Sequence, residues 1–298
     1  MRIWYHHRWG NIKLKPVCFS IMVPDAYTGS LAFKEVVEML MYVMQEKGIP
    51  CDLRNNEILP SHINVVFGAH MMDPFFIYQL PKDTVVFNTE KLSEDNGQLV
   101  DTVCGFAEAG LHLWDCSEAN VTLLTRKISP GSLSRIVLGY HRLLDRIPAT
   151  EEPEIDLLVF GLIDPSHQPV MDQLISSGLN ICHLPDIYGE KRDEYIAKSK
   201  AVLNLNYRDS ELSEIVRICY LLCNGKQVIA EIEKGTVVNP DLLKSLVPCS
   251  RSDMSETAIN LIRSGSWRLP NEIGREVMRQ RDVWGSVENG LKKVLGRA

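Results

Sequence analysis

Residues 201–231 read AVLNLNYRDSELSEIVRICYLLCNGKQVIAE, and this stretch decides the fold. It holds a short apolar run, a polar turn, an apolar segment of helical length, an Asn-Gly pair and a second short apolar run. Short β-branched runs without clean alternation are typical of strands buried on both faces of a parallel sheet, and Asn-Gly is a common helix stop. The stretch therefore predicts a strand over 201–207, a helix over 211–223 and a strand over 226–231.

The same alternation of strand and helix extends in both directions from this unit. In the first half we expect a helix over 31–45 and strands over 18–23, 51–55, 63–69, 84–88, 111–114 and 120–125. In the second half we expect strands over 156–162 and 180–184, and helices over 169–177, 191–199, 254–263 and 271–295. Residues 2–9, RIWYHHRW, suit an additional edge strand without a defined place. This order predicts an α/β protein built from parallel sheets.

A polar stretch with two prolines, RIPATEEPE at 146–154, separates two such series of strands and helices. A chain of 298 residues is long enough for about two domains. We therefore expect two doubly wound parallel-sheet domains, residues 1–150 and residues 151–298.

Composition narrows the class of protein and its partners. Apolar residues make up 45% and charged residues 23%, values typical of a globular protein. The net charge is -6 and no dense Lys/Arg run appears, so we expect no nucleic-acid partner. No apolar run approaches the roughly twenty residues of a spanning helix, and the N-terminus does not resemble a signal peptide. The eight cysteines form no Cys-x-x-Cys pair, which indicates free thiols, no metal site and a cytoplasmic location.

Candidate site residues follow from the rule that open α/β sheets bind ligands at the carboxyl ends of their strands. In the first domain His70 and Glu90 follow predicted strands, and either could be the general base that deprotonates an acceptor hydroxyl. The alternative is a loop histidine and a carboxylate that caps a helix. Asp115 and Ser117 favour a helix-capping turn.

The second domain offers a phosphate site where the helix over 211–223 begins. Gly161, Asn206 and Tyr207 follow strands, and Arg217 is the one cation between positions 215 and 223. Glu214 precedes Arg217 by three positions, so both lie on one helix face. Either the two form an intrahelical ion pair, or Arg217 binds a diphosphate at the helix N-terminus while Glu214 contacts ribose or the guanidinium.

The run from 203 to 231 also resembles the nucleotide-sugar half of bacterial GT-B-type glycosyltransferases. The shared pattern includes LN-x-N-Y, then E-x-x-R, then L-L-x-N and V-I-A-E, which here covers Asn206, Tyr207, Glu214 and Arg217. FNTEKL (87–92), LHLWDCS (111–117) and GYHRLLD (139–145) are weaker similarities. The resemblance implies two Rossmann-like parallel-sheet domains that face a cleft, with residues 1–150 on the acceptor side and residues 151–298 binding a nucleoside-diphosphate sugar as donor. It also implies no essential metal and a last helix that crosses back to the first domain.

The sequence departs from that family in two places. The loop after the first strand of the second domain, FGLIDPSHQP (160–169), has no basic residue, so Gly161 is left to admit a close backbone approach. The Glu-x-seven-Glu pattern of retaining members is absent.

From the resemblance we expect a glycosyltransferase with an unidentified glycan, lipid-linked or peptide acceptor. The alternative is a catalytically silent nucleotide-sugar-binding or partner-binding protein of the same fold. An NAD-dependent oxidoreductase lacks support because no G-x-G-x-x-G follows a strand.

Overall fold

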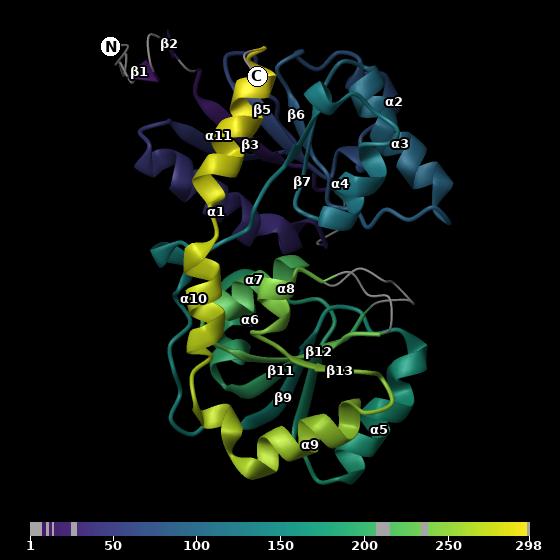
Figure 1. The fold of residues 1–298 in the computed structure, drawn as a ribbon, viewed down its shortest axis with the longest axis vertical. Coiled ribbons are helices and arrows are strands. Elements are labelled where there is room, and N and C mark those ends of the chain that lie inside the picture. Colours follow the sequence, from purple (N-terminus) through teal and green to yellow (C-terminus); the bar gives the residue numbers. More distant parts are fainter. Residues whose placement is uncertain are drawn as a thin grey trace. The chain divides into compact units, whose positions relative to one another are not determined.

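A computed structural model describes residues 8–9, 12–13, 15–24, 29–206, 215–233 and 238–296. The chain divides into two compact units, one formed by Met1–Val137 with Asp282–Ala298 and the other by Leu138–Arg281. Each unit contains one parallel sheet with helices around it (Figure 1). The predicted α/β class with two parallel-sheet domains is therefore confirmed.

The first unit contains a six-stranded parallel sheet in the order β4-β3-β5-β6-β7-β8. Its strands are β3 (Val17–Ile21), β4 (Cys51–Asn55), β5 (Ile63–Phe67), β6 (Val85–Phe87), β7 (His112–Asp115) and β8 (Leu133–Arg135). Its helices are η1 (Gly29–Phe33), α1 (Lys34–Glu46), η2 (Ala69–Met71), α2 (Pro74–Ile77), α3 (Gly97–Glu108), α4 (Glu118–Leu124), η3 (Pro130–Ser132) and α11 (Val283–Val294). A short antiparallel pair, β1 (Arg8–Trp9) and β2 (Ile12–Lys13), precedes the sheet.

The second unit contains a five-stranded parallel sheet in the order β10-β9-β11-β12-β13. Its strands are β9 (Ile155–Phe160), β10 (Ile181–Leu184), β11 (Ser199–Asn204), β12 (Gln227–Glu231) and β13 (Val247–Cys249). Its helices are η4 (Arg142–Leu144), η5 (Pro165–His167), α5 (Gln168–Ser176), α6 (Gly189–Ala197), α7 (Ile215–Cys223), α8 (Pro240–Leu243), α9 (Met254–Ser264), η6 (Ser266–Arg268) and α10 (Glu272–Gln280).

Both faces of the second sheet are covered, which explains its continuous apolar strands. Alternate residues of β9 and β11, such as Leu157 and Leu203, pack in one cluster with residues of α5 and α9 such as Leu174 and Ala258. Figure 1 shows α6 and α7 on the other side of that sheet. Side chains in a strand alternate between faces, so a sheet between two helical layers needs apolar residues at every position.

Several predicted elements need correction. Of the strand expected over 120–125, residues 120–124 lie instead in helix α4, and Thr125 follows its end. Ser117 caps that helix by accepting the Asn120 N–H, and its buried residues Asn120 and Leu124 have helical spacing. The single helix expected over 271–295 is two helices, α10 and α11, and Asp282 caps the second by accepting the Gly285 N–H.

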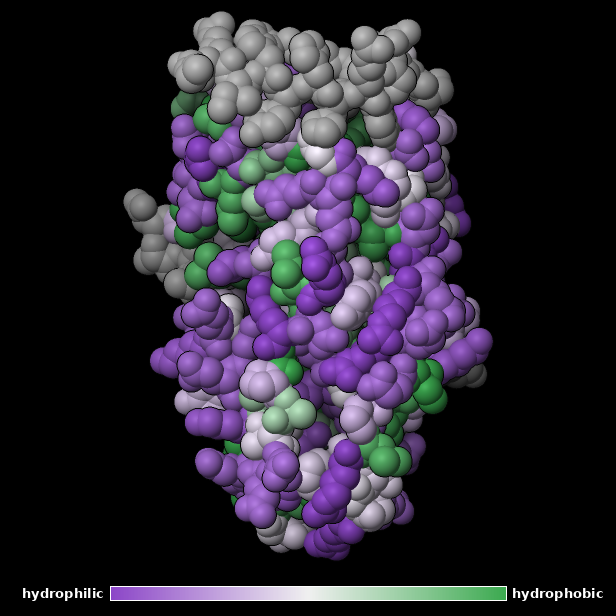
Figure 2. All heavy atoms as spheres, turned by 90° about the vertical axis from the view of Figure 1, so that its left-hand side faces the viewer, coloured by the Kyte–Doolittle hydropathy of each residue, from purple (hydrophilic) through white to green (hydrophobic). Residues whose placement is uncertain are grey.

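Other elements went unpredicted, and one stretch is only partly described. Strands β8 and β13 and helices α2, α3 and α8 were not predicted. Of RIWYHHRW, only Arg8 and Trp9 are described, and they pair with β2 rather than with the main sheet. Within the described ranges, no helix combines the length and apolar character needed to cross a bilayer. Figure 2 shows a face on which hydrophilic side chains predominate and apolar ones form small separate patches, as on ordinary water-exposed surfaces.

Helix α11 approaches the first sheet closely through a glycine. A β-carbon placed on Gly290 would lie 2.9 Å from atoms of the Trp114 indole. Trp114 has no exposed surface, so the ring cannot move aside into solvent. Gly290 therefore allows this helix to pack directly on the end of β7.

Gly290→Ala should destabilise the protein by about 1–3 kcal/mol, because the new methyl overpacks the indole. The matched control is Gly105→Ala in α3, where an added β-carbon meets nothing within 4 Å. The control should stabilise by about 0.5–1 kcal/mol through helix propensity. Urea unfolding of the two variants checks this, and equal stabilisation by both would contradict the packing described.

Candidate functional site

The carboxyl edge of the second sheet brings two predicted residues together, Gly161 and Arg217. Gly161 directly follows β9 with φ of 93°, a left-handed conformation that favours glycine. A β-carbon there would lie 2.7 Å from Nη2 of Arg217. The backbone of the loop therefore lies directly against the guanidinium, and the positive φ favours glycine at this position.

The guanidinium of Arg217 is held by two further groups of the same edge. Its Nη1 donates to Oδ1 of Asn204 at 3.3 Å, and its central carbon lies 5.0 Å from the centre of the Phe160 ring. Asn204 is the last residue of β11 and is fully buried. These contacts fix the cation at the ends of β9 and β11, where open sheets bind ligands.

Two other predicted residues cannot be placed in this site. Tyr207 and Glu214 lie in 207–214, outside the described residues. The ion pair between Glu214 and Arg217 therefore stays a prediction. The contacts of Arg217 given above are with groups at the strand ends.

Asn206 forms hydrogen bonds with Glu231, a residue with a buried carboxylate at the end of β12. Its backbone N–H donates to Oε2 of Glu231 at 2.8 Å, and its amide nitrogen donates to the Glu231 carbonyl at 3.1 Å. Glu231 is fully buried and also accepts from Nε of Arg251 at 2.7 Å, while its Oε2 lies 2.7 Å from Nε2 of His167. Burial alone would raise the pKa of Glu231, but the hydrogen bonds from His167, Asn206 and Arg251 outweigh it and lower the pKa.

The predicted strand over 226–231 ends at Glu231, but neither His167 nor Arg251 was predicted as a site residue. His167 ends η5, whose start is marked by the Asp-Pro pair at 164–165, and Arg251 follows β13. Only the fold brings them to the same carboxylate.

Three buried polar atoms at this edge have no hydrogen-bond partner among the described residues. They are Nδ2 of Asn204, Oδ1 of Asn206 and Nδ1 of His167. Buried polar groups in proteins are almost always paired, so a cluster of unpaired ones requires an explanation. A polar ligand at the edge would be one.

In the first unit, the structure brings the two candidate bases together. His70 lies in η2 after β5, and its Nε2 is 3.4 Å from Oε1 of Glu90. The His70 side chain is 25% exposed and that of Glu90 33%, so solvent and ligands can reach both. The Thr89 hydroxyl also donates to Oε1 of Glu90 at 3.2 Å. A carboxylate beside an imidazole can orient the ring and stabilise its protonated form, as a general base requires.

A second buried carboxylate, Asp115, lies at the end of β7 in the same unit. Its Oδ2 accepts from the amides of Asn88 at 2.7 Å and Asn120 at 3.0 Å, and its Oδ1 accepts the Ser117 N–H at 2.7 Å. Burial raises the pKa of Asp115 to about 7, and these hydrogen bonds oppose only part of that rise. Ser117 caps α4, in agreement with the capping turn expected at Asp115 and Ser117.

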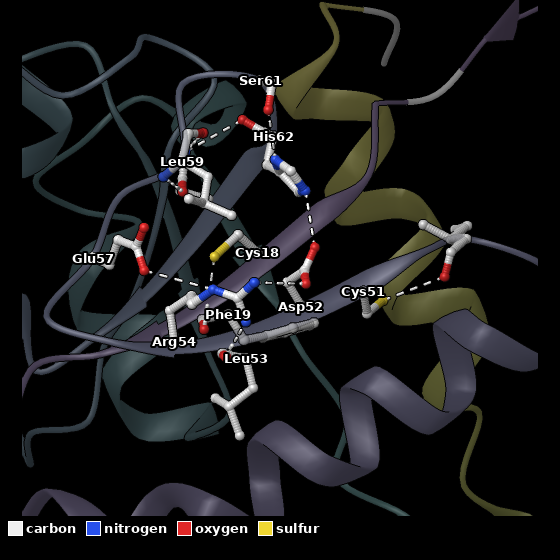
Figure 3. Close-up of polar contacts among 12 residues, drawn as sticks. Cys18, Phe19, Cys51, Asp52, Leu53, Arg54, Glu57, Leu59, Ser61 and His62 are labelled. Atoms are coloured by element: carbon white, nitrogen blue, oxygen red, sulfur yellow. Dashed lines mark hydrogen bonds and ion pairs between the residues drawn. The ribbon is translucent and has the colours of Figure 1, made fainter. Parts of the chain in front are cut away.

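The opposite, amino end of the first sheet carries a hydrogen-bonded chain of Ser61, His62 and Asp52 (Figure 3). Ser61 Oγ lies 2.9 Å from Nδ1 of His62, whose Nε2 lies 3.0 Å from Oδ2 of Asp52. Arg54 pairs with Asp52 at 3.1 Å and with Glu57 at 3.6 Å. Because Ser61 and His62 are consecutive and precede β5, these contacts tie that loop to the edge strand β4. Across the described ranges, no group of three or more potential metal ligands occurs.

Comparisons with known proteins identify the fold. No family profile matches the chain, and no curated protein matches its sequence. Among solved structures, Anabaena HepE in complex with UDP and glucose has a TM-score of 0.60 at 10% identity, over 95% of this chain and 100% of that one. AviGT4, a glycosyltransferase involved in avilamycin A biosynthesis, has a TM-score of 0.55 at 13% identity, over 95% and 98%.

A third similar structure, TarM, is a longer protein. Its TM-score is 0.50 at 10% identity, and the match covers 78% of this chain and 55% of TarM. The chain thus spans about half of TarM but the full length of HepE. The fold is that of the GT-B glycosyltransferases, which confirms the resemblance drawn from the sequence.

The pKa of Asp115 predicts how stability depends on pH. A carboxyl whose pKa is about 7 when folded, against an ordinary value of 3.8, favours folding at low pH and loses that contribution as pH rises through 7. The unfolding free energy of the wild type, minus that of Asp115→Asn, should fall by on the order of 2 kcal/mol between about pH 5 and pH 8.

Urea unfolding at several pH values measures this difference. Asp101→Asn, at an exposed position of α3, is the matched control and should show no such trend. A difference that stays constant or grows with pH would contradict the assignment.

Proposed function

We propose that this protein is a glycosyltransferase that moves a sugar from a nucleoside-diphosphate sugar to a glycan, lipid-linked or peptide acceptor. The observation that carries the proposal is the Arg217 guanidinium at the carboxyl edge of the second sheet, against Gly161 and Asn204. The GT-B fold supports it, because similar structures include HepE in complex with UDP and with UDP-glucose. None of the eight cysteines forms a disulfide, which supports a reducing, cytoplasmic location.

The donor diphosphate would bind at the N-terminal end of α7. Arg217 supplies a fork of donors that suits phosphate oxygens, and Gly161 lets backbone approach the same place. Asn206, Tyr207 and Glu214 are the proposed contacts to base, ribose or guanidinium. The unpaired atoms of Asn204, Asn206 and His167 support a polar ligand at this edge. We propose no metal, since the charge of the leaving diphosphate would be met by Arg217 and helix N–H groups.

The acid–base chemistry would come from the first unit. We propose the His70–Glu90 pair as the general base. The base takes the proton of an acceptor hydroxyl as its oxygen forms a bond to the anomeric carbon. The bond between that carbon and the diphosphate oxygen breaks, and the nucleoside diphosphate leaves with the electron pair.

One observation favours a second candidate function, a catalytically silent nucleotide-sugar-binding or partner-binding protein. The loop that follows β9, GLIDPSHQP, contains no lysine or arginine. Two assays separate the functions: a thermal-shift panel of nucleoside-diphosphate sugars, then a donor hydrolysis assay. Stabilisation with slow release of nucleoside diphosphate supports the enzyme. Stabilisation without turnover under any acceptor supports the silent protein.

Arg217→Met should weaken binding of the nucleoside diphosphate by about 1.5–3 kcal/mol, the scale of a charge-assisted hydrogen bond. Affinity for the bare nucleoside should barely change, because the nucleoside has no phosphate to contact the guanidinium. Calorimetric titration of both ligands measures this, with Arg263→Met in α9 as a control that should leave both affinities unchanged. Equal losses for nucleoside and diphosphate would count against a phosphate role.

His70→Gln and Glu90→Gln, made one at a time, test the base. Loss of the true base should lower turnover by roughly two orders of magnitude, while affinity for the nucleoside diphosphate is retained. If the two side chains act as a unit, the double variant should be no slower than the worse single one. The base assignment is wrong if neither variant loses activity while the donor still binds.

A further inference from the structure

We infer that Asn88, Asp115 and Asn120 are positioning residues that hold Glu90 against His70; the inference rests on the proposed role of that pair. None of the three is placed in contact with a substrate. They act on the backbone of residues 88–92, the loop that carries Glu90. The three are called the amide clamp below.

The amide clamp forms hydrogen bonds with both backbone groups of Glu90, its N–H and its carbonyl. Oδ1 of Asn88 accepts the Glu90 N–H at 3.2 Å, and its Nδ2 donates to the Glu90 carbonyl at 3.0 Å. Nδ2 of Asn120 donates to the same carbonyl at 2.8 Å, and its Oδ1 accepts the Leu92 N–H at 3.0 Å. Side chains from the end of β6 and from helix α4, which are far apart in sequence, therefore donate to the same carbonyl group.

Asp115 fixes which way the two amides point. Its Oδ2 accepts from both Nδ2 atoms, so each amide must turn its oxygen away from the carboxyl. Those oxygens are the groups that accept the Glu90 and Leu92 N–H groups. The ionised carboxylate of Asp115 accepts hydrogen bonds at both oxygens, so this form permits one arrangement of the clamp.

Burial makes this arrangement rigid. Asn88 is 6% exposed, Asp115 1% and Asn120 3%, and buried polar groups are costly unless every bond is made. The Glu90 side chain is itself one-third exposed, and it contacts the His70 imidazole and the hydroxyl of Thr89, which lies on the same loop. Its place beside His70 therefore depends on where the clamp holds its backbone. A displacement of about 1 Å in such a group is enough to lower the rate of a positioned proton transfer.

The test compares two buried asparagines that each hold a loop. Asn120→Ala removes one arm of the clamp. The matched control is Asn64→Ala at the opposite end of the same sheet, where Asn64 is fully buried and bonds both backbone groups of Leu59 and the carbonyl of His62. Both variants should lower the urea midpoint, so loss of stability alone cannot distinguish them. Asn88→Ala is the second clamp variant if Asn120→Ala fails to fold.

The first readout needs no enzymatic activity. Diethyl pyrocarbonate acylates an imidazole nitrogen that it can reach and that has a free lone pair, and the Glu90 carboxylate, 3.4 Å from Nε2 of His70, obstructs approach to that nitrogen. The rate of modification of His70, followed by mass spectrometry of its peptide, should rise several-fold in Glu90→Gln and equally in Asn120→Ala. It should not rise in Asn64→Ala, and adding Asn120→Ala to Glu90→Gln should have no further effect.

The second readout is turnover with the donor. Asn120→Ala should lower kcat by roughly tenfold or more, the effect of losing a residue that orients a reacting group, while KM for the donor stays unchanged. In the Glu90→Gln background the same substitution should cost nothing further.

The two readouts separate failure of this inference from failure of the proposed function. A modification rate in Asn120→Ala and Asn88→Ala that matches Asn64→Ala would overturn the clamp, whatever the activity. If the modification rate of His70 rises in both clamp variants while the wild-type protein never turns over a donor, the clamp is upheld and the glycosyltransferase is rejected. An effect of Asn120→Ala on kcat that simply adds to that of Glu90→Gln would overturn positioning through Glu90.

Discussion

Burial of both faces of each parallel sheet is the constraint on which the rest of this structure depends. Strands such as β5 and β9 contain almost only apolar side chains, because helices cover them on both sides. Functional polar side chains are therefore placed where a strand ends, at the edge of the sheet. His70, Glu90, Gly161 and Arg217 all lie just after strands or just inside the helix that follows one.

A buried carboxylate ends a strand in each sheet, Asp115 in the first and Glu231 in the second, and the two are stabilised in different ways. Glu231 is bonded by Arg251, His167 and a backbone N–H, so charge and hydrogen bonds overcome its burial and its pKa is lowered. Asp115 is bonded by two neutral amides and a backbone N–H, so burial prevails and its pKa rises to about 7. Glu231 holds the groups around Asn206 by hydrogen bonds, and Asp115 orients the amides that hold the loop carrying Glu90. Uncharged partners suffice to orient a loop, and the hydrogen bonds to Glu231, one of them from the Arg251 cation, favour its charged form.

The sequence predicted the sheets well because their signal is local, but the polar networks were beyond it. Short apolar runs and the Asn-Gly stop located most strands and α7. NVTLLT was mistaken for a strand because its β-branched residues carry a strand signal that the Ser117 cap and tertiary packing override. His167 and Arg251 join Glu231 from 64 and 20 positions away, and Asn120 joins Asn88 through a carboxylate 27 positions from Asn88. Spacing along the chain contains no such information.

The central claim is that Arg217 holds the diphosphate of a nucleotide-sugar donor at the edge of the second sheet. The most direct measurement is a crystal structure of the protein with UDP, the nucleotide present in HepE. We expect a phosphate oxygen within hydrogen-bond distance of the Arg217 guanidinium, close to the backbone of Gly161. UDP bound elsewhere, or bound at this edge with its phosphates pointing away from Arg217, would contradict the account.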